Sequence, residues 1–301
     1  CNREAMITMN INLLRNTYAA TAAMVITLFA QPTTIKAQTS YNFQIADTKV
    51  TSDNYKDLSK IAGVSGNITY EPGTKTLTLE NATIETNEFP GMVTNATMKI
   101  VLIGNNTIIS KQRSGLTNQS SGDITITGKG GTLSVKGAEE SDGLDAMIGI
   151  GNWGRITIKE CTVEAVGGAA GLYSGLWKFE NCTVRAKGNG DKGDEHFGSI
   201  CWLWDEEPYL IDCYVASPTG TEWKEYKEGN YTYYSLYGAD KKVVTGWVTI
   251  TSGDPAGIDN ITTTNTATNG IYNIGGMRLS KEIKDLPKGL YIVNGKKVVK
   301  K

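Results

Sequence analysis

The sequence predicts an all-β fold, a right-handed parallel β-helix of about six coils, and two observations carry this prediction. An alternating apolar strand, a polar turn and a second alternating strand recur about every two dozen residues. The 34 Gly against 7 Pro in 301 residues indicate many tight turns. Crossovers between parallel strands of one sheet are almost always right-handed, so the coil should be right-handed too.

The chain begins with a segment, 1–37, that is interpreted as a secretory signal peptide. Arg15 precedes the apolar stretch 18–30, and Ala37 supplies a small residue at a cleavage point. The stretch is shorter than the roughly 20 apolar residues of a transmembrane helix. Residues 1–8, ahead of the first plausible start, are interpreted as translation overrun. We therefore expect a secreted or cell-surface protein.

The repeat places its anchors at the residue before the second strand's apolar position. The best copies are ITIKECTVEA from Ile156 and WKFENCTVRA from Trp177. The anchors are Thr83, Thr107, Thr132, Thr162, Thr183 and Tyr214. The residues after the first five should face the core: Ile84, Ile108, Leu133, Val163 and Val184. A second column, for a third strand of each coil, is Met92, Leu116, Ile148, Leu172 and Ile200.

The turn between the two strands has its own pattern. Two residues before the anchors stand Asn81, Asn105, Gly130, Glu160, Asn181 and Asp212, and five of these six are types that tolerate a left-handed backbone. One residue before the last three anchors stand Cys161, Cys182 and Cys213, which stacking should place in a ladder. Either they fill one line of the coil as small, soft residues, or Cys161 and Cys182 form a disulfide.

The repeats make up a capped solenoid over 38–251. Residues 41–70 precede the repeats and should cap the first coil. Residues 231–250 contain YTYYSLY, a GADKK turn and VVTGWVTI, and they should form a hairpin that closes the last coil, because an uncovered end leaves an open strand edge.

The remainder is a linker followed by a small C-terminal β-module. Residues 252–269 are rich in Thr, Asn and Gly without periodicity, which predicts a linker. Within 270–301, Asn294-Gly295 between YIV and KKVV is a strong hairpin signal, and Gly275-Gly276 is a weaker one. The segments IYNIGG, LPKGLYIV and NGKKVVK resemble the C-terminal sorting tails of type IX secretion substrates. This resemblance implies export machinery as a partner; a purely structural module is the alternative.

A second resemblance covers the solenoid. VTSDNYKDLSKIAGVSGNITYEPGTKTLTLENATI, together with the coils, is similar to secreted Bacteroidetes-type β-helix proteins of pectin-lyase-like fold labelled carbohydrate-binding. It implies a polysaccharide or cell-surface glycan as partner. The chain's formal net charge of −1 offers no basic field for a phosphate backbone, which argues against nucleic acid.

Two acidic loops are candidates for calcium. They lie at the same corner of two coils, about 10 Å apart, with the short GGAA corner of 167–170 between them. Oxygen-rich, Gly-containing loops suit calcium, and the candidate ligands are Glu139, Asp142, Asp145, Asp191, Asp194 and Glu195. Solvated polar turns are the alternative interpretation.

Tryptophans supply candidate sugar contacts. Trp177 lines up with inward strand positions and Trp202 alternates with Ile200, so both are expected in the core. Trp153 and Trp204 fall in a turn and are the candidate ligand-binding residues.

No catalytic motif stands out. The one histidine, His196, lies in GDEHFG and lacks the Gly-His-Gly of inverting hydrolases of this fold. The leading hypothesis is a non-catalytic exported β-helix that binds glycan or a surface partner. The alternatives are a calcium-dependent polysaccharide lyase and a structural or adhesin-like surface protein.

Overall fold

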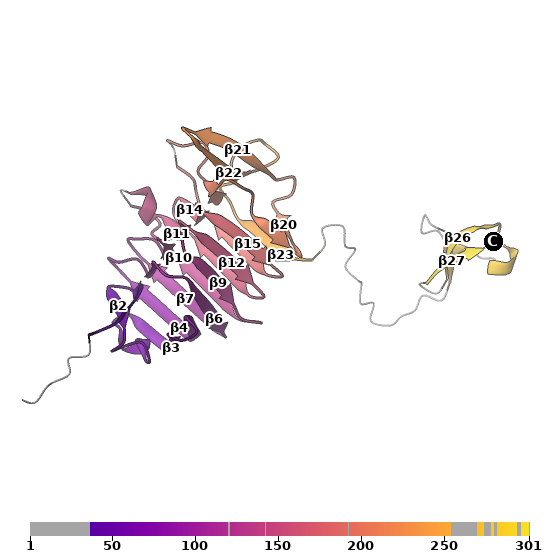
Figure 1. Cartoon of the computed structure of the whole chain (residues 1–301). Coiled ribbons are helices and arrows are strands. Elements are labelled where there is room, and N and C mark those ends of the chain that lie inside the picture. The colour runs from indigo at the N-terminus through magenta and orange to yellow at the C-terminus, as the bar shows by residue number, and fades with distance from the viewer. Residues whose placement is uncertain are drawn as a thin grey trace, which may run out of the picture.

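The computed structural model describes residues 37–119, 121–141, 143–191, 193–253, 270–273, 278–279, 282–293 and 296–300. The predicted signal peptide, apart from residue 37, and most of the predicted linker (254–269) lie outside these residues. The described chain is all-β, and its strands stack into a nearly closed, solenoid-shaped body (Figure 1). Its only helices are three short 3-10 turns: η1 (Leu58–Lys60), η2 (Leu144–Ala146) and η3 (Ile283–Asp285). None of them is long and apolar enough to cross a membrane.

Parallel pairing arranges most strands in three stacks. The first stack is β4 (Thr76–Thr86), β6 (Met98–Ile103), β9 (Asp123–Thr127), β12 (Arg155–Lys159), β15 (Leu176–Glu180) and β19 (Tyr209–Ile211). The second stack continues from β4 through β7 (Asn105–Ser110), β10 (Thr132–Lys136), β13 (Thr162–Val166) and β16 (Thr183–Lys187). Because β4 pairs with both β6 and β7, these two stacks form one large sheet.

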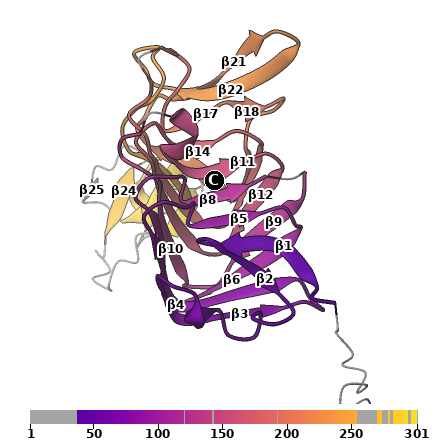
Figure 2. The same cartoon turned by 90° about the vertical axis from the view of Figure 1, so that its left-hand side faces the viewer.

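The third stack forms a separate sheet of short strands, which we call the short-strand sheet (Figure 2). Its parallel strands are β5 (Met92–Thr94), β8 (Leu116–Asn118), β11 (Ile148–Asn152), β14 (Ala170–Tyr173) and β17 (Ile200–Cys201). Two strands cover its first edge in antiparallel pairing, β1 (Ser40–Ile45) and β2 (Thr48–Thr51).

The inward positions predicted from the repeat are confirmed. All five aliphatic residues expected inside the coil are at most 1% exposed, namely Ile84, Ile108, Leu133, Val163 and Val184. Burying each such side chain contributes about 1.5 to 3 kcal/mol. Alternation along each strand sends the intervening residues outward, so the interior is one continuous apolar core.

The predicted column of threonines is broken at one step. Thr83 pairs with Thr107, but Thr107 pairs with Ser134, and Thr132 faces Asn105. The longer GKGG turn of 128–131, closed by the Gly131 N to Gly128 O hydrogen bond of 2.7 Å, delays the next strand by two residues. An even shift preserves the side-chain parity, which is why the inward residues remain correct.

A second two-residue shift affects the short-strand sheet. Ile150, and not the predicted Ile148, pairs with both Leu116 and Leu172. The segment 137–147 that precedes β11 contains η2, and the sequence spacing did not account for this insertion. Ile148 is nevertheless buried, since it has the same parity as Ile150.

The corner turns follow the predicted chemistry with one correction. Five predicted residues adopt a positive φ: Asn81, Gly130, Glu160, Asn181 and Asp212. In the remaining coil Gly104 takes this conformation, with a φ of 65°, and Asn105 does not. Glycine pays no steric penalty there, so the turn forms one residue earlier.

The cysteines occupy the line expected of them. Cys161, Cys182 and Cys213 are buried, and all four described cysteines are free thiols. The alternative disulfide between Cys161 and Cys182 is not formed.

Buried amides form a second ladder inside the short-strand sheet. Asn118 donates from Nδ2 to Asn152 Oδ1 at 2.9 Å, and both residues are fully buried. Asn152 Nδ2 donates to the carbonyls of Gly154 and Leu176, while its Oδ1 also accepts from the Gly154 backbone N–H. These bonds satisfy backbone groups at the corner, where the strands end.

The first coil is capped as predicted. The strand β3 (Val64–Glu71) runs antiparallel along β4, and β1 pairs antiparallel with β5. Both antiparallel strands cover open edges of the parallel stacks.

The closing hairpin predicted over 231–250 is wrong in its partners. The main partner of β22 (Tyr231–Tyr237) is β21 (Glu222–Glu228), and together with β18 (Leu203–Trp204) they form a three-stranded sheet, here called the capping sheet. The strand β23 (Val248–Ser252) instead inserts antiparallel between β16 and β20 (Cys213–Ser217). The hydrogen bonds of β23 to both neighbours satisfy backbone groups that the last coil would leave open. Because β23 lies between β16 and β20, the predicted anchors Thr183 and Tyr214 do not pair with each other.

The C-terminal residues form their own antiparallel sheet of β24 (Ile271–Asn273), β25 (Arg278–Leu279), β26 (Gly289–Val293) and β27 (Lys296–Lys300). Val293 pairs with Lys296, the register that a two-residue turn at Asn294-Gly295 requires. Tyr272 pairs with Arg278, which is one residue away from the register of a two-residue turn at Gly275-Gly276. Asn294-Gly295 and Gly275-Gly276 themselves lie outside the described residues.

Candidate functional site

The outer face of the short-strand sheet presents one row of side chains. Pairing aligns Val93, Thr117, Gly151 and Tyr173 on successive strands. Each stands next to an inward core residue, so alternation points it away from the core. The row therefore forms the floor of any surface site on this sheet.

Trp153 covers the gap that Gly151 leaves in this row. A Cβ added to Gly151 would stand 3.0 Å from Trp153 Cζ3, which places the indole directly over the glycine. The ring meets Tyr173 edge-on, with centroids 6.1 Å apart and planes at 68°. The indole is only half-buried, so part of it remains available to a ligand.

A hollow of about 440 Å³ opens beside Trp153. The Ser114 and Thr117 hydroxyls, 2.6 Å apart, lie in it, and η2 places Asp145 on its wall. Its lining is Pro90, Arg113, Ser114, Thr117, Gln119, Asp145, Ala146 and Trp153.

A second hollow of about 360 Å³ continues the first, since Pro90 and Gln119 line both. Side-chain amides and hydroxyls dominate it, and its other lining residues are Ser40, Asn42, Phe43, Gln44, Lys49, Val93 and Asn95. We call the two hollows together the groove. Amides and hydroxyls both donate and accept hydrogen bonds, as sugar hydroxyls require, and an aromatic face supplies apolar contact area.

The structure separates the two predicted ligand-binding tryptophans. Trp153 lies in the groove, whereas Trp204 lies on β18, opposite Tyr233, and lines neither hollow. Trp177 is 2% exposed, as predicted for the core. Trp202 was also predicted for the core, but it is only partly buried and its Nε1 donates to Asp194 Oδ2 at 2.9 Å.

The two acidic loops flank the short Gly/Ala corner as predicted. Gly168 N donates to Ala138 O at 2.9 Å, and Asn189 N donates to Gly168 O at 3.0 Å. These bonds run from one loop through the corner to the other, so the three corners are stacked.

The candidate calcium ligands do not converge, however. Asp145 lines the groove, whereas Asp191, Asp194 and Glu195 line another hollow, and Glu139 lines none of these. Asp142 lies outside the described residues. Across the described part of the chain, no three His, Cys, Asp or Glu side chains gather as a metal site. Calcium binding therefore stays a prediction of the sequence.

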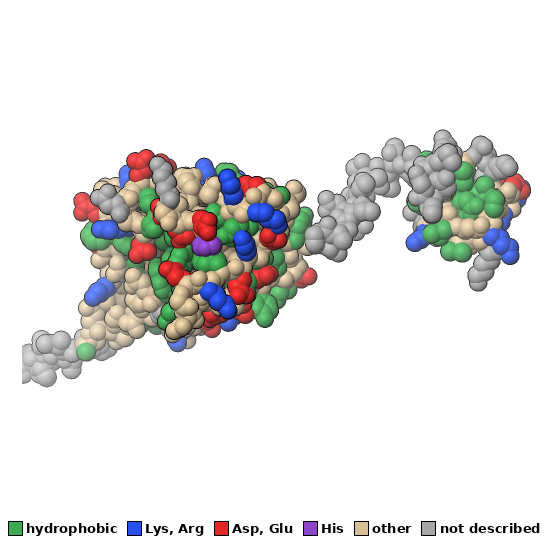
Figure 3. Space-filling model, turned by 90° about the horizontal axis from the view of Figure 1, so that it is seen from above, with side chains coloured by type: hydrophobic (Ala, Val, Ile, Leu, Met, Phe, Trp, Pro, Cys, Tyr) green, Lys and Arg blue, Asp and Glu red, His purple; other side chains and the backbone are tan. Residues whose placement is uncertain are grey.

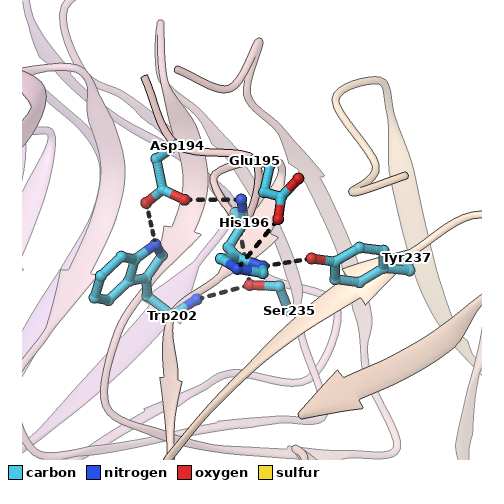
Figure 4. Close-up of polar contacts among 6 residues, drawn as sticks. All are labelled: Asp194, Glu195, His196, Trp202, Ser235 and Tyr237. Carbon is cyan, nitrogen blue, oxygen red and sulfur yellow. Dashed lines mark hydrogen bonds and ion pairs between the residues drawn. The ribbon is translucent and has the colours of Figure 1, made fainter. Parts of the chain in front are cut away.

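The acidic loop that carries Asp191, Asp194 and Glu195 borders a cleft of about 450 Å³ against the capping sheet, and His196 lies in this cleft (Figure 3). His196 Nδ1 and Tyr237 Oη lie 2.5 Å apart, and the imidazole stacks on Tyr226 with centroids 3.8 Å apart. Asp194 accepts hydrogen bonds from Trp202 Nε1 and from the His196 backbone N–H (Figure 4). Three lysines share this cleft with the carboxylates, namely Lys224, Lys241 and Lys242.

These contacts join the loop of Asp194 and His196 to the capping sheet through Tyr226, Ser235 and Tyr237. We call these residues, together with Trp202, the His196 cluster. Burial, followed by the charges of Glu195 and Asp194, raises the pKa of Tyr237, so its hydroxyl stays a hydrogen-bond donor at neutral pH. Ser235 Oγ donates to the His196 carbonyl and not to the imidazole, so these residues do not assemble a nucleophile and base (Figure 4).

Sequence reasoning missed several residues in the groove and beside it. Tyr173, which packs against Trp153 but lines neither hollow, follows the inward Leu172 by one position, so strand alternation could have placed it outside. Arg113, Gln119 and Asn95 carried no such signal, because only the stacking of separate coils brings them together.

No protein-family model matches this chain, and neither a curated protein nor a solved structure matches it. We therefore infer the binding site from the geometry of the groove.

Proposed function

We propose that this chain is an exported, non-catalytic, right-handed parallel β-helix that binds glycan in the groove of the short-strand sheet. The observation that carries the proposal is the half-buried indole of Trp153, held over Gly151 at one end of a run of amides and hydroxyls. Concave sites that combine apolar contact area with a few convergent polar groups are the usual form of small-molecule sites.

The two kinds of groove contact have different roles. The Trp153 face offers a rigid apolar platform for the C–H surface of a sugar ring, at little cost in side-chain entropy. Gln44, Asn95 and Gln119 present amides that donate and accept at once, which matches the alternating hydroxyls of a pyranose. Arg113 and Asp145 add one charge of each sign at the Trp153 end.

Two resemblances in the sequence support export of the chain and glycan as its ligand. The coils resemble secreted Bacteroidetes-type carbohydrate-binding β-helices, and the last residues resemble type IX sorting tails. A polysaccharide or cell-surface glycan is accordingly the proposed ligand, at the cell surface or outside the cell.

A glycan array probed with the purified chain tests this proposal. We expect binding to a subset of glycans, and we expect Trp153→Ala to weaken it by up to about tenfold, since loss of an aromatic contact costs of order 0.5 to 1.5 kcal/mol. Trp204→Ala is the matched control and should bind as the parent does. Equal losses in both variants, or no binding by the parent, would reject the groove as the site.

The same glycans also test the lyase alternative. A lyase would release an unsaturated uronate product, whose absorbance can be followed during incubation with acidic polysaccharides. We expect no such product, since the candidate calcium ligands on which such a lyase would depend line different hollows.

A further inference from the structure

The cysteine ladder contains one pair of thiols in reach of each other. Cys182 Sγ and Cys213 Sγ lie 4.0 Å apart. Cys213 Sγ also accepts from the Cys182 backbone N–H at 3.4 Å and donates to the Cys182 carbonyl at 3.7 Å. These contacts hold the two residues side by side where the fifth coil turns into the last one.

The third member of the ladder does not share this contact. Cys161 directs its thiol to the Ile126 carbonyl, 3.6 Å away, on the preceding coil. Cys201 lies on β17 of the short-strand sheet, away from the ladder. The pair is therefore specific, although the sequence presents three equivalent cysteines.

We propose that Cys182 and Cys213 are an oxidation site that closes into a disulfide and fastens the last coil to the solenoid. A disulfide requires the sulfur atoms to approach from their separation of 4.0 Å to about 2.05 Å. Proposed export would carry the chain into compartments where disulfides persist.

The step is a thiol–disulfide exchange with a small disulfide compound as oxidant. The Cys213 thiolate attacks the oxidant, breaks its S–S bond and releases one thiol, leaving a mixed disulfide on Cys213. The Cys182 thiolate then displaces the second thiol and forms the Cys182–Cys213 bond. Both cysteine protons end on the released thiols, and the oxidant takes up the two electrons.

Accessibility sets the order of attack. Cys213 is 9% exposed and Cys182 is 3% exposed, so Cys213 meets the oxidant first. Burial, followed by the neighbouring Cys213, raises the pKa of Cys182. Cys182 therefore stays a thiol while Cys213 forms the mixed disulfide with the oxidant. A surface hollow of about 330 Å³ beside the ladder is lined by Cys161, Cys182 and Ser252, so it reaches the second cysteine of the pair and not Cys213.

The crosslink would act where the solenoid is least protected. The last strand of the first stack, β19, pairs only with β15, and its Tyr209 and Ile211 are exposed. Stacked repeats lose structure first from their ends, because a terminal coil has one neighbour. A bond from Cys182 to Cys213 encloses β16, β17, β18 and β19 in one covalent loop.

The test uses the full chain, purified reduced and equilibrated with oxidised glutathione over a range of ratios to reduced glutathione. Remaining thiols are then alkylated, and the peptides are mapped by mass spectrometry. We expect a Cys182–Cys213 linkage in the parent and in Cys161→Ser, with Cys201 alkylated. Alkylation of both Cys182 and Cys213 at every ratio, or a Cys161–Cys182 linkage, would overturn the proposal.

Hydrogen exchange gives a second readout that does not depend on the serine variants folding equally well. In the parent, oxidation should slow exchange over β19 and β20 by about tenfold or more, because the crosslink restricts the opened end. Cys213→Ser should exchange at the same rate whether or not it has been treated with the oxidant. If the Cys182–Cys213 disulfide forms but hydrogen exchange over β19 and β20 is not slowed, the disulfide does not fasten the last coil.

Discussion

The indole of Trp153 lies on Gly151, where an added Cβ would stand 3.0 Å from Cζ3 and 3.4 Å from Cη2 of the ring. Gly151 faces outward between Thr117 and Tyr173, so any side chain there would take the space that the ring occupies. The glycine thereby decides where the largest apolar surface of the groove lies.

Gly151→Ala should weaken glycan binding by about 0.5 to 1.5 kcal/mol, the range of a displaced aromatic contact. The new methyl group meets the far end of a side chain, so the ring moves while the strand remains, and stability should change by less than about 1 kcal/mol. Isothermal titration with the best array glycan and urea unfolding measure the two effects.

Gly246→Ala is the matched control, since a Cβ there meets nothing within 4 Å. It should leave both quantities unchanged. Unaltered binding in Gly151→Ala would show that the position of Trp153 is irrelevant to the ligand.

Asn152→Ala should destabilise the solenoid by about 2 to 3 kcal/mol. The substitution leaves the Gly154 and Leu176 carbonyls and the Asn118 amide without this partner in a fully buried place. Denaturant unfolding measures the loss. Asn67→Ala, whose side chain is exposed, should cost less than about 0.5 kcal/mol, and similar costs in both would contradict the ladder's role.

Glu180→Gln should lower the melting temperature at pH 7 and lower it less near pH 3. Hydrogen bonds from Lys159 and then Lys178 lower the pKa of Glu180, so the carboxylate stabilises the fold above its unfolded-state pKa. That contribution is lost as the pH falls through the lowered folded-state pKa. The effect should be small, because the group is solvent-accessible.

Differential scanning calorimetry at the two pH values checks this, with Glu88→Gln as the control for an exposed glutamate that has no ion pair among the described residues. A larger effect at pH 3 than at pH 7 would reverse the sign and reject the assignment.

The sequence predicts one calcium site formed by two acidic loops, whereas the structure does not bring their carboxylates together. Asp145 and the Asp191, Asp194 and Glu195 group line different hollows, so we expect free calcium to leave the melting temperature unchanged. A rise with calcium, abolished in Asp191→Asn with Asp194→Asn, would instead support the site predicted from the two loops.

Much of the fold could be predicted because its signals are local. Alternation along Ile124–Ile126 or Val163–Ala165 identifies the inward side chains, and Asn181 or Asp212 marks a corner. Register depends on turn length, which spacing measures poorly. The two errors of register at Thr132 and Ile148 were even shifts, which leave the side chains of those strands on their predicted faces.

The candidate site was less predictable, because its members come from different coils. Trp153 and Asp145 were singled out from the sequence for separate reasons, as a sugar contact and a calcium ligand, and the structure places them in one hollow. The acidic residues near His196 were expected to face them, but hydrogen bonds to Trp202 and to backbone groups hold Asp194 in its own cleft.

The sequence by itself determined that the chain is all-β, which residues face the core, and where most corners turn, since each follows from the chemistry of a few neighbouring residues. Only the tertiary structure decided that β23 inserts between β16 and β20, that Cys213 meets Cys182, and that Trp153 lies over Gly151. These contacts join parts of the chain brought together by stacking, and their energies depend on distances that no local pattern encodes.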